Sequence, residues 1–268
     1  MIRLRRLFRK NGKTVIIALD HGLGMHVNPE LDDTGRLLEQ VIEGGADGVL
    51  VSYGTARKYQ SILSDVAVIM RADGGGSQIG PSGNGPQLLY TIEDALRIGA
   101  DAVVCMGFPG TPYEHQTMEV LAALVREGHA WGMPVVAEML PGGFTSDPPK
   151  TVENIRLASR TGCEYGADVI KTTYVGPPEE FRKVIDASYQ PVIVLGGEKT
   201  SDLNGMFLSI EQAISVGAAG VAIGRNVWRH RDPVSITRAL VDIVHNGKRV
   251  SELELREIAE KQNGGRNP

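Results

Sequence analysis

A short phrase recurs four times in this 268-residue chain and constrains its fold more than any other feature. Each copy starts with Gly-Ala, follows a helical pattern and opens an apolar run; the copies begin at Gly45, Gly99, Gly166 and Gly217. Glycine suits the left-handed turn that ends a helix, and the small residue after it lets the helix pack closely against a strand. The four junctions therefore predict repeated helix–strand units.

Eight apolar runs complete the pattern, and they lack the polar alternation of half-exposed strands, as expected for a parallel sheet that is covered on both faces. The strands are expected at residues 15–19, 48–52, 67–71, 102–106, 134–138, 169–171, 192–195 and 221–223. Helical patterns separate most of them, at residues 117–130, 152–165, 178–187 and 233–245. Eight such units in about 250 residues predict an α/β fold, a (β/α)8 TIM barrel. A doubly wound open sheet is the alternative, but no Gly-x-Gly-x-x-Gly motif opens the chain.

The barrel is expected to form one domain over residues 1–268, with a disordered tail at 263–268. The formal charge of −4 gives no general attraction to nucleic acid, and no apolar run approaches the roughly 20 residues that span a bilayer. Cys105 and Cys163 lack metal-ligand spacing, so each is expected to be a buried thiol. The basic run at residues 3–10 is expected to be a solvated helix face. We expect a cytoplasmic protein that binds neither nucleic acid nor membrane.

Lys171 is the residue that suggests a chemistry. In a barrel of this kind the carboxyl ends of the strands meet at one open end, the mouth, and Lys171 ends the predicted strand that holds Val169 and Ile170. An ammonium group beside those side chains is poorly solvated, which favours the neutral amine. A neutral amine attacks a carbonyl and forms an iminium, so Lys171 is predicted to be a Schiff-base nucleophile.

Acidic side chains follow other predicted strands at the same mouth. Asp20 follows the first strand, where it can hold the ammonium or carry a proton, and Glu138 closes the fifth strand. Asp73 begins a Gly-, Ser- and Pro-rich loop at residues 73–86, which is expected to form part of the site. His21 fits a structural role as well as a functional one. The six histidines of the chain show no metal-ligand spacing, so the chemistry is predicted to need no metal.

The loops after the last two predicted strands have the composition of an anion-binding cradle. Gly196 and Gly197 follow the seventh strand and Gly224 follows the eighth, so backbone N–H groups can approach a phosphate closely. Lys199 and Arg225 add positive charge to these loops. Together the two loops predict a phosphorylated small-molecule ligand.

These motifs, taken in order, resemble the archaeal-type class I fructose-bisphosphate aldolases of the DeoC/FbaB aldolase family. The motifs that carry the resemblance lie at residues 18–22, 167–171, 196–200 and 224–228. Two sibling groups share them: the amino-dideoxy-heptulosonate synthases, and the thiolase that processes phosphorylated autoinducer-2.

The resemblance implies a TIM barrel with a covalent Schiff base on Lys171 and no other cofactor. It also implies an aspartate at the end of the first strand, here Asp20. The implied phosphate site comprises Gly197, Lys199, Gly224 and Arg225. Relatives of this kind are commonly ring-shaped homo-oligomers, often decamers, and the resemblance implies the same for this chain.

One segment departs from the aldolase pattern. Aldolase members carry Tyr-Pro-Arg-Gly after the fifth strand, where the tyrosine donates a proton and the arginine helps to bind substrate. Here Leu140 and Gly142 occupy those two positions, and neither can do so. Glu138, which points the same way along the strand, is a hypothetical replacement for the missing acid. The thiolase sibling also lacks the tyrosine, and it resembles this chain at residues 71–74 and 113–116.

Three functions are consistent with these residues. The first is a class I aldolase that cleaves or forms a carbon–carbon bond in a phosphorylated ketose such as fructose 1,6-bisphosphate. The second is a thiolase or acyltransferase that acts on a phosphorylated diketone with coenzyme A, or an aldol-type synthase that uses a phosphorylated ketose donor. The third is a catalytically silent barrel that senses a phosphorylated ligand.

Overall fold

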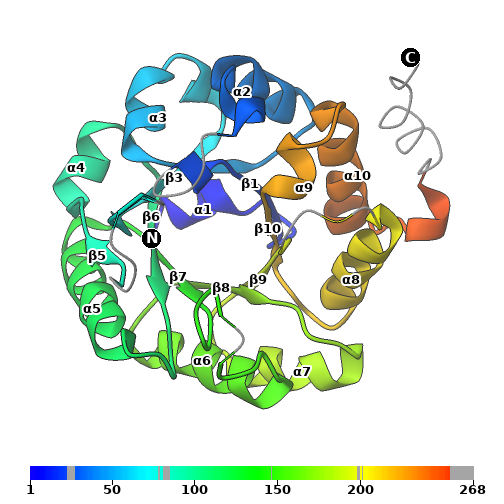
Figure 1. Cartoon of the computed structure of the whole chain (residues 1–268). Coiled ribbons are helices and arrows are strands. Elements are labelled where there is room, and N and C mark those ends of the chain that lie inside the picture. The colour runs from blue at the N-terminus through cyan, green and yellow to red at the C-terminus, as the bar shows by residue number, and fades with distance from the viewer. Residues whose placement is uncertain are drawn as a thin grey trace.

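Parallel strands close into a barrel, as the sequence predicts (Figure 1). The computed structural model describes residues 1–22, 28–77, 79–80, 85–145, 147–197, 200 and 202–253, and within them the barrel has eight strands. Around the barrel these are β1 (Thr14–Ala18), β2 (Gly48–Val51), β3 (Ala67–Arg71), β6 (Ala102–Gly107), β7 (Val135–Met139), β8 (Val169–Thr173), β9 (Val192–Leu195) and β10 (Gly220–Ile223). β10 pairs with β1, so the TIM barrel is confirmed.

Helices cover the outside of the barrel (Figure 1). They are α2 (Thr34–Glu43), α3 (Tyr53–Lys58), α4 (Ile92–Arg97), α5 (Glu114–Trp131), α6 (Val152–Glu164), α7 (Pro178–Ala187), α8 (Leu203–Ser215) and α10 (Pro233–Asn246), with the short α9 (Arg225–Trp228) after β10. Single 3-10 turns are η1 (Asp20–Gly22), η2 (Pro29–Leu31), η3 (Ile62–Asp65) and η4 (Val250–Glu252). In the part of the chain that is described, no helix combines the length and the apolar character needed to cross a bilayer.

The strands are continuous apolar runs because both of their faces are buried. Along β1, Val15 and Ile17 pack in the outer core between strands and helices, whereas Ile16 and Ala18 belong to an inner core that fills the barrel. Cys105 and Cys163 are both buried free thiols, as predicted, and both lie in the outer core. The alternation between the two cores decides which later residues of each strand reach the mouth.

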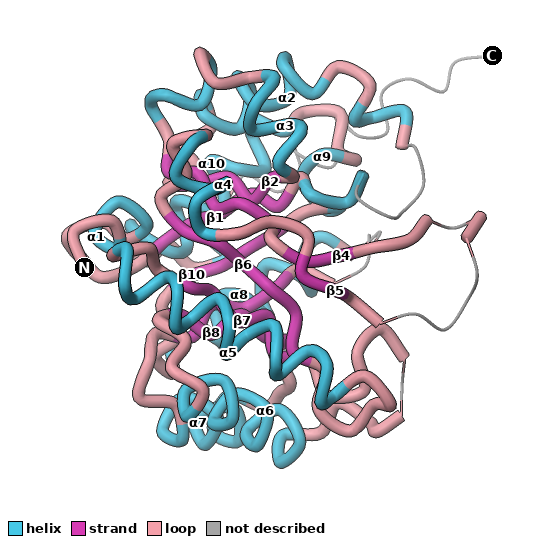
Figure 2. The backbone as a smooth tube through the Cα atoms, turned by 90° about the vertical axis from the view of Figure 1, so that its left-hand side faces the viewer, coloured by secondary structure: helices cyan, strands magenta, loops and turns pink. Residues whose placement is uncertain are grey.

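The amino-terminal segment closes the end of the barrel opposite the mouth. There α1 (Leu4–Leu7) places Leu7, which is 1% exposed, in the inner core, and Leu4 and Phe8 pack against the same core. Figure 2 shows α1 at one end of the barrel and the β4–β5 hairpin at the other. The barrel therefore opens only toward the mouth as far as the described residues define it.

The glycines of the repeated phrase adopt the left-handed conformation that the sequence predicts. The φ angles of Gly45, Gly99, Gly166 and Gly217 are 93°, 76°, 91° and 107°. After each one the next residue donates its N–H back to the helix; for example, Ala46 N donates to Val41 O at 3.1 Å. This is the hydrogen-bond pattern of a glycine-terminated helix, so the prediction of helix–strand junctions is confirmed.

The aspartate that follows in three copies of the phrase has a role that the sequence analysis misses. Asp47, Asp101 and Asp168 each accept an N–H from the preceding barrel strand, with donors Val15, Val68 and Val135 at 2.7, 3.0 and 2.9 Å. An arginine or histidine side chain also lies beside each: Arg9 and His245 at Asp47, Arg6 at Asp101, and His129 at Asp168. Arg6 and Arg9 thus tie the amino-terminal segment to the barrel. The basic side chains at positions 5, 6, 9 and 10 are nevertheless exposed, in agreement with the predicted solvated face.

The segment at 73–86, expected to be a loop, has a small antiparallel ladder at its base. In this ladder β4 (Asp73–Gly74) pairs with β5 (Gln87–Leu88). Figure 2 shows that this hairpin extends beyond the mouth. Only residues 73–74 of the expected loop are therefore in a strand, because β5 begins just after it, while residues 78 and 81–84 lie outside the described part of the chain.

Replacing Asp101 with alanine tests the role of the repeated aspartate. The change leaves the buried N–H of Val68 without its acceptor and Arg6 without its partner. A buried donor without an acceptor costs about 1–3 kcal/mol, so we expect the free energy of unfolding to fall by about 2 kcal/mol in urea titrations. Glu39→Ala, at an exposed position of α2, is the control and should change it by less than about 0.5 kcal/mol. Equal losses in the two variants would contradict the assignment.

Candidate active site at the barrel mouth

The strand alternation brings three charged side chains into the barrel just below the mouth. Arg71, Glu138 and Lys171 each lie two residues after a member of the inner core, and those members are Ile69, Val136 and Val169. The sequence analysis expects Lys171 to end its strand. In the structure β8 continues two residues further, to Thr173. Asp20 lies in η1, just after β1, rather than in the strand itself.

The Lys171 amine is paired with a carboxylate inside the barrel. Its Nζ lies 2.7 Å from Glu138 Oε1, and the two side chains are only 6% and 8% exposed. Glu138 and Lys171 are register partners on the neighbouring strands β7 and β8, which places them side by side. The sequence analysis expects apolar surroundings for this amine; the strand register instead gives it a carboxylate at hydrogen-bond distance.

Arg71 stands at the centre of a group of carboxylates. Its Nε donates to Asp20 Oδ2 at 2.8 Å, its Nη1 donates to Asp73 Oδ1 at 3.2 Å, and its Nη2 donates to Glu138 Oε2. The Arg71 side chain is 3% exposed. Because Glu138 also holds Lys171, a continuous chain of ionic contacts runs from Asp20 to the amine. We refer to Asp20, Arg71, Asp73, Glu138 and Lys171 as the charge cluster.

The two cations of the charge cluster keep Glu138 ionised. Burial alone would raise the pKa of Glu138, but the charges of Lys171 and Arg71 and their hydrogen bonds outweigh it and lower the pKa from 4.5 to about 2. Burial also opposes the charge of Arg71, yet Asp20, Glu138 and Asp73 together raise the pKa of Arg71 well above its ordinary range. At physiological pH Glu138 is therefore a carboxylate that can accept a proton, and it holds none to donate.

Asp73 is more enclosed than a substrate-binding residue was expected to be. It is 1% exposed, and besides Arg71 its Oδ2 accepts the backbone N–H of Met106 at 2.7 Å. Burial raises the pKa of Asp73 above 3.8, although Arg71 and the Met106 N–H act against this rise. These contacts tie the base of the β4–β5 hairpin to β3 and β6. A direct contact of Asp73 with substrate stays a prediction.

His21 lies between the charge cluster and the loop after β10. Its Nδ1 is 3.6 Å from Asp20 Oδ1. Burial lowers the pKa of His21 below 6.5 against the opposing charge of Asp20, so the ring is neutral near pH 7. Gly224 leaves room for this ring, because a Cβ at that position would lie 2.5 Å from His21 Cε1. The glycine at 224 is thus required for packing in addition to any role toward an anion.

The loops after β9 and β10 come together, as the sequence predicts. Asn226 connects them: its Nδ2 donates to Gly196 O at 3.0 Å and its Oδ1 accepts from Thr200 N at 2.9 Å. Arg225 Nη2 also donates to Gly197 O, at 3.2 Å. The sequence analysis names the glycines and Arg225 but misses Asn226. The sequence feature that could have identified Asn226 is its position directly after Arg225, at the start of the short helix α9.

Lys199, the other cation predicted for this cradle, lies outside the described residues, so its place stays a prediction. Gly197 has a φ of 64°, which only glycine adopts easily, and it follows Gly196 at the end of β9. The two loops therefore have the backbone character of an anion site, and the binding of a phosphate there also stays a prediction.

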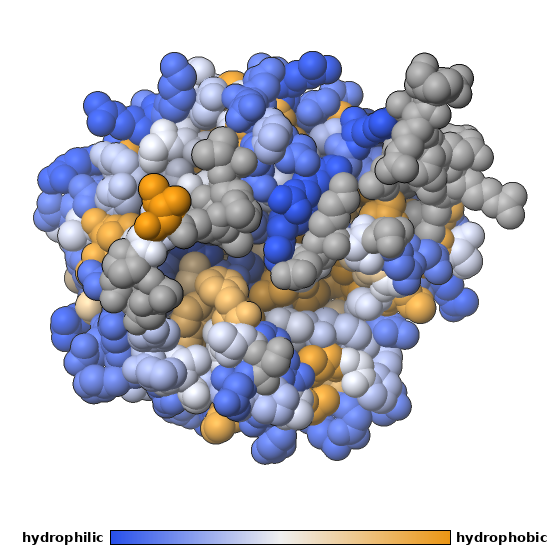
Figure 3. Space-filling view, viewed as in Figure 1, coloured by the Kyte–Doolittle hydropathy of each residue, from blue (hydrophilic) through white to orange (hydrophobic). Residues whose placement is uncertain are grey.

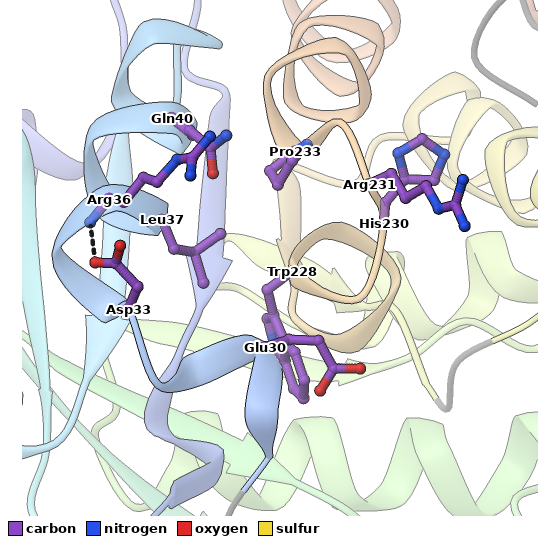
Figure 4. Close-up of a pocket in the computed structure, with 9 residues that line it drawn as sticks. All are labelled: Glu30, Asp33, Arg36, Leu37, Gln40, Trp228, His230, Arg231 and Pro233. Carbon is purple, nitrogen blue, oxygen red and sulfur yellow. Dashed lines mark hydrogen bonds between the residues drawn. The ribbon is translucent and has the colours of Figure 1, made fainter. Parts of the chain in front are cut away.

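The mouth itself is hollowed. Figure 3 looks onto it in the direction of Figure 1 and shows a depression near the centre of this face. A separate cavity of roughly 300 Å³ lies outside the barrel, between α2 and the segment from α9 to α10 (Figure 4). It is lined by Glu30, Asp33, Arg36, Leu37, Gln40, Trp228, His230, Arg231 and Pro233. None of these residues belongs to the charge cluster, so a reactant in this cavity would not meet Lys171.

Two other observations bear on the site. The motif at 113–116 lies at the start of α5, and its His115 side chain is 89% exposed and paired with Glu119, away from the charge cluster.

Among the residues that the structure describes, no group of three or more His, Cys, Asp and Glu side chains is arranged to hold a metal ion.

The fold and the charge cluster together fit a class of protein, a βα-barrel enzyme in which a buried lysine amine lies beside carboxylates. The chain belongs to the DeoC/LacD family of aldolases, whose family model matches residues 14–230. That span includes every described strand of the barrel. The chain is accordingly an enzyme of the class I aldolase type, in which a lysine forms a Schiff base and no metal or cofactor takes part.

Two curated relatives match almost the whole chain. One is the class 1 fructose-bisphosphate aldolase of Thermoproteus tenax, which is 32% identical over 256 residues and covers 92% of this chain and 95% of its own length. The other is 2-amino-3,7-dideoxy-D-threo-hept-6-ulosonate synthase 1 of Archaeoglobus fulgidus, 34% identical over 254 residues and covering 93% of each chain.

Solved structures agree with the sequence relatives. An archaeal fructose 1,6-bisphosphate aldolase superposes with a TM-score of 0.83 at 31% identity, covering 92% of this chain and 99% of its own. A further archaeal fructose-1,6-bisphosphate aldolase, solved with its catalytic lysine covalently bound to the carbinolamine intermediate, has a TM-score of 0.81 at 30% identity and covers 91% and 98%.

The lowered pKa of Glu138 predicts a pH-dependent contribution to stability. Because folding lowers this pKa from 4.5 to about 2, the ion pairs of Glu138 stabilise the fold fully above about pH 4.5, and this contribution is lost as the pH falls toward 2. Its size is about 3 kcal/mol. We expect Glu138→Gln to be less stable than the wild type at pH 7 and the difference to shrink below about pH 4.5.

Urea unfolding of both proteins between pH 7 and about 3.5 measures this difference. Asp73, whose raised pKa acts in the opposite direction, is present in both proteins and so affects both curves. A stability difference that stays constant over this range would contradict the assigned ion pairs.

Proposed function

We propose that this chain is a class I aldolase that cleaves or forms a carbon–carbon bond in a phosphorylated ketose such as fructose 1,6-bisphosphate. The observation that carries the proposal is the Lys171 amine inside the barrel, 2.7 Å from the Glu138 carboxylate. The substrate class is supported by the relatives, among them the fructose-bisphosphate aldolase of Thermoproteus tenax. A cytoplasmic location and a homo-oligomeric ring, both expected from the sequence, belong to the same proposal.

The substrate is placed by its phosphate. Gly196, Gly197 and Gly224 would present backbone N–H groups to this anion, and Arg225 and Lys199 would add positive charge. β8, which carries Lys171, is the direct neighbour of β9 in the barrel. A ketose phosphate held by these loops would therefore extend its carbonyl carbon over the amine.

Glu138 supplies the proton transfers of the first step. It takes a proton from the Lys171 ammonium, and the neutral amine then attacks the substrate carbonyl to give a carbinolamine. The same proton returns from Glu138 to the carbinolamine hydroxyl, which leaves as water, and an iminium on Lys171 remains beside the ionised Glu138. Glu138 thus acts as an acid only after it has accepted the proton of Lys171, because its lowered pKa keeps it ionised in the resting site.

Asp20 is the residue assigned to the second step. The iminium draws electrons from the adjacent carbon–carbon bond, which breaks to give an enamine while a substrate hydroxyl loses its proton and becomes the carbonyl of the leaving aldehyde. Asp20 would accept that proton; its Oδ2 is held by Arg71, and Oδ1 lies on the side of His21. Bond formation follows the same path in reverse.

Position 140 favours a second candidate. Leu140 is apolar and only 4% exposed. The aldolase motif described in the sequence analysis has a proton-donating tyrosine at this position. A thiolase that transfers an acyl group from a phosphorylated diketone to coenzyme A fits a site without that tyrosine. A product that forms from such a diketone only with coenzyme A, with no cleavage of ketose phosphates, would select this candidate.

Borohydride reduction in the presence of dihydroxyacetone phosphate tests the Schiff base. We expect a stable adduct on Lys171 by peptide mass spectrometry, none in Lys171→Met, and a loss of ketose cleavage of at least about 1,000-fold in that variant. Lys183→Met, at an exposed lysine of α7, is the matched control and should keep both adduct and activity. Bound ligand without an adduct in the wild type would support a phospho-ligand sensor instead.

Glu138→Gln tests the proton transfers. The amide keeps the size of the side chain but cannot accept the proton of Lys171, so we expect kcat to fall about 100- to 10,000-fold with little change in KM. Steady-state cleavage of fructose 1,6-bisphosphate measures this effect. Glu164→Gln, at an exposed acid of α6, should leave kcat unchanged. Full turnover by Glu138→Gln would remove Glu138 from the mechanism.

A further inference from the structure

Arg71 uses each of its guanidinium nitrogens for a carboxylate on a different segment. Nε binds Asp20 in η1, Nη1 binds Asp73 in β4, and Nη2 binds Glu138 in β7. Arg71 itself ends β3. A single planar group therefore fixes four segments of the mouth relative to one another, in directions that the rigid guanidinium sets.

The charge balance of the cluster depends on this arginine. Arg71 and Lys171 are the cations and Asp20, Asp73 and Glu138 the carboxylates, which gives a formal charge of −1 for the five groups. Without Arg71 one ammonium would face three carboxylates, of which Asp73 and Glu138 are buried. Buried carboxylates in that situation take up protons, since the charged forms repel one another and are poorly solvated.

A lysine could not take the place of Arg71. An ammonium is a point charge on a flexible stem, whereas the guanidinium presents its N–H donors in a fixed plane toward three separate acceptors. The side chain of Arg71 is also 3% exposed, so water cannot replace a lost contact without a change in packing. The geometry, and not only the charge, is therefore specific to arginine.

We propose that Arg71 is a positioning residue that holds the Glu138 carboxylate in place against the Lys171 amine and holds Asp20 beside it. The inference rests on the proposed Schiff-base function, in which Glu138 and Asp20 move protons and Arg71 does not touch the reactant. Its effect on the chemistry passes through Glu138, whose two carboxylate oxygens are divided between Lys171 and Arg71.

The ionisation of Glu138 depends on groups from every side of the mouth. The groups that face it or act on it through the cluster are Lys171 from β8, Arg71 from β3, Asp73 from β4, Asp20 and His21 from η1, and Cys105 from β6. Lys171 and Arg71 favour its charged form, whereas burial disfavours it. Removing Arg71 therefore moves the protonation of Glu138 to higher pH, where it blocks the acceptance of the Lys171 proton.

The test measures how fast dihydroxyacetone phosphate and borohydride label Lys171 across a range of pH. For Arg71→Lys we expect the rate to fall about 100-fold, because charge is kept but the carboxylate is no longer aligned. The double variant Arg71→Met/Asp73→Asn keeps the formal charge of the cluster at −1. For this variant we expect the same fall in labelling rate, and we expect the acidic limb of the curve of labelling rate against pH to shift to higher pH. Arg97→Lys is the matched control: Arg97 pairs with Glu93 and Asp94 on α4 but is 66% exposed, and its labelling should not change.

Circular dichroism and urea unfolding give the folded fraction of each variant, and the labelling rates are compared per folded molecule. If Arg71→Lys does not fold, the double variant alone is used for the test. It has the same formal charge in the cluster as the wild type, because one cation and one carboxylate are removed together. Wild-type labelling rates and an unshifted acidic limb in a folded variant would overturn the inference and leave the proposed function intact. A wild type that is never labelled at Lys171 would overturn the proposed function itself.

Discussion

A lysine amine enclosed in a barrel needs an opposite charge within reach, and the arrangement of the mouth follows from that requirement. Glu138 supplies the charge at 2.7 Å, and a buried ammonium without such a partner would be strongly destabilising. Glu138 is itself buried, so its second oxygen binds Arg71, and Arg71 in turn binds Asp20 and Asp73. Each of these charges is thus compensated by the next, which keeps the Lys171 amine and the Glu138 carboxylate at fixed positions.

The barrel supplies the dry, rigid surroundings in which this compensation is effective. Its inner core fills the lumen beneath the charge cluster, and Leu7 of α1 closes the opposite end. Low polarity below the cluster strengthens the ionic contacts above it and leaves the mouth as the side from which a reactant can approach. The repeated aspartates anchor the strands at the closed end, so each end of the barrel has its own set of ionic contacts.

Much of the site was predictable because strand alternation is a local property. Lys171 and Glu138 follow inward-pointing apolar residues at a spacing of two, and the glycine loops follow their strands directly, so the sequence analysis names them. Arg71 follows the same rule, but its importance lies in three contacts with residues 2, 51 and 67 positions away, and no local pattern encodes these. Asn226 and the ladder of the hairpin were missed for the same reason, since their partners lie on other segments.

The sequence by itself determined the repeated helix–strand units, the eight buried strands and the presence of an amine among acids at the strand ends, because period, glycine position and apolar runs are written along the chain. Only the tertiary structure decided which acid holds the amine. The register between β7 and β8 pairs Glu138 with Lys171 and leaves Asp20 to Arg71. That choice depends on closure of the barrel. Closure places the ends of strands that are distant in sequence at the same level along the barrel axis, where their charged side chains form ion pairs.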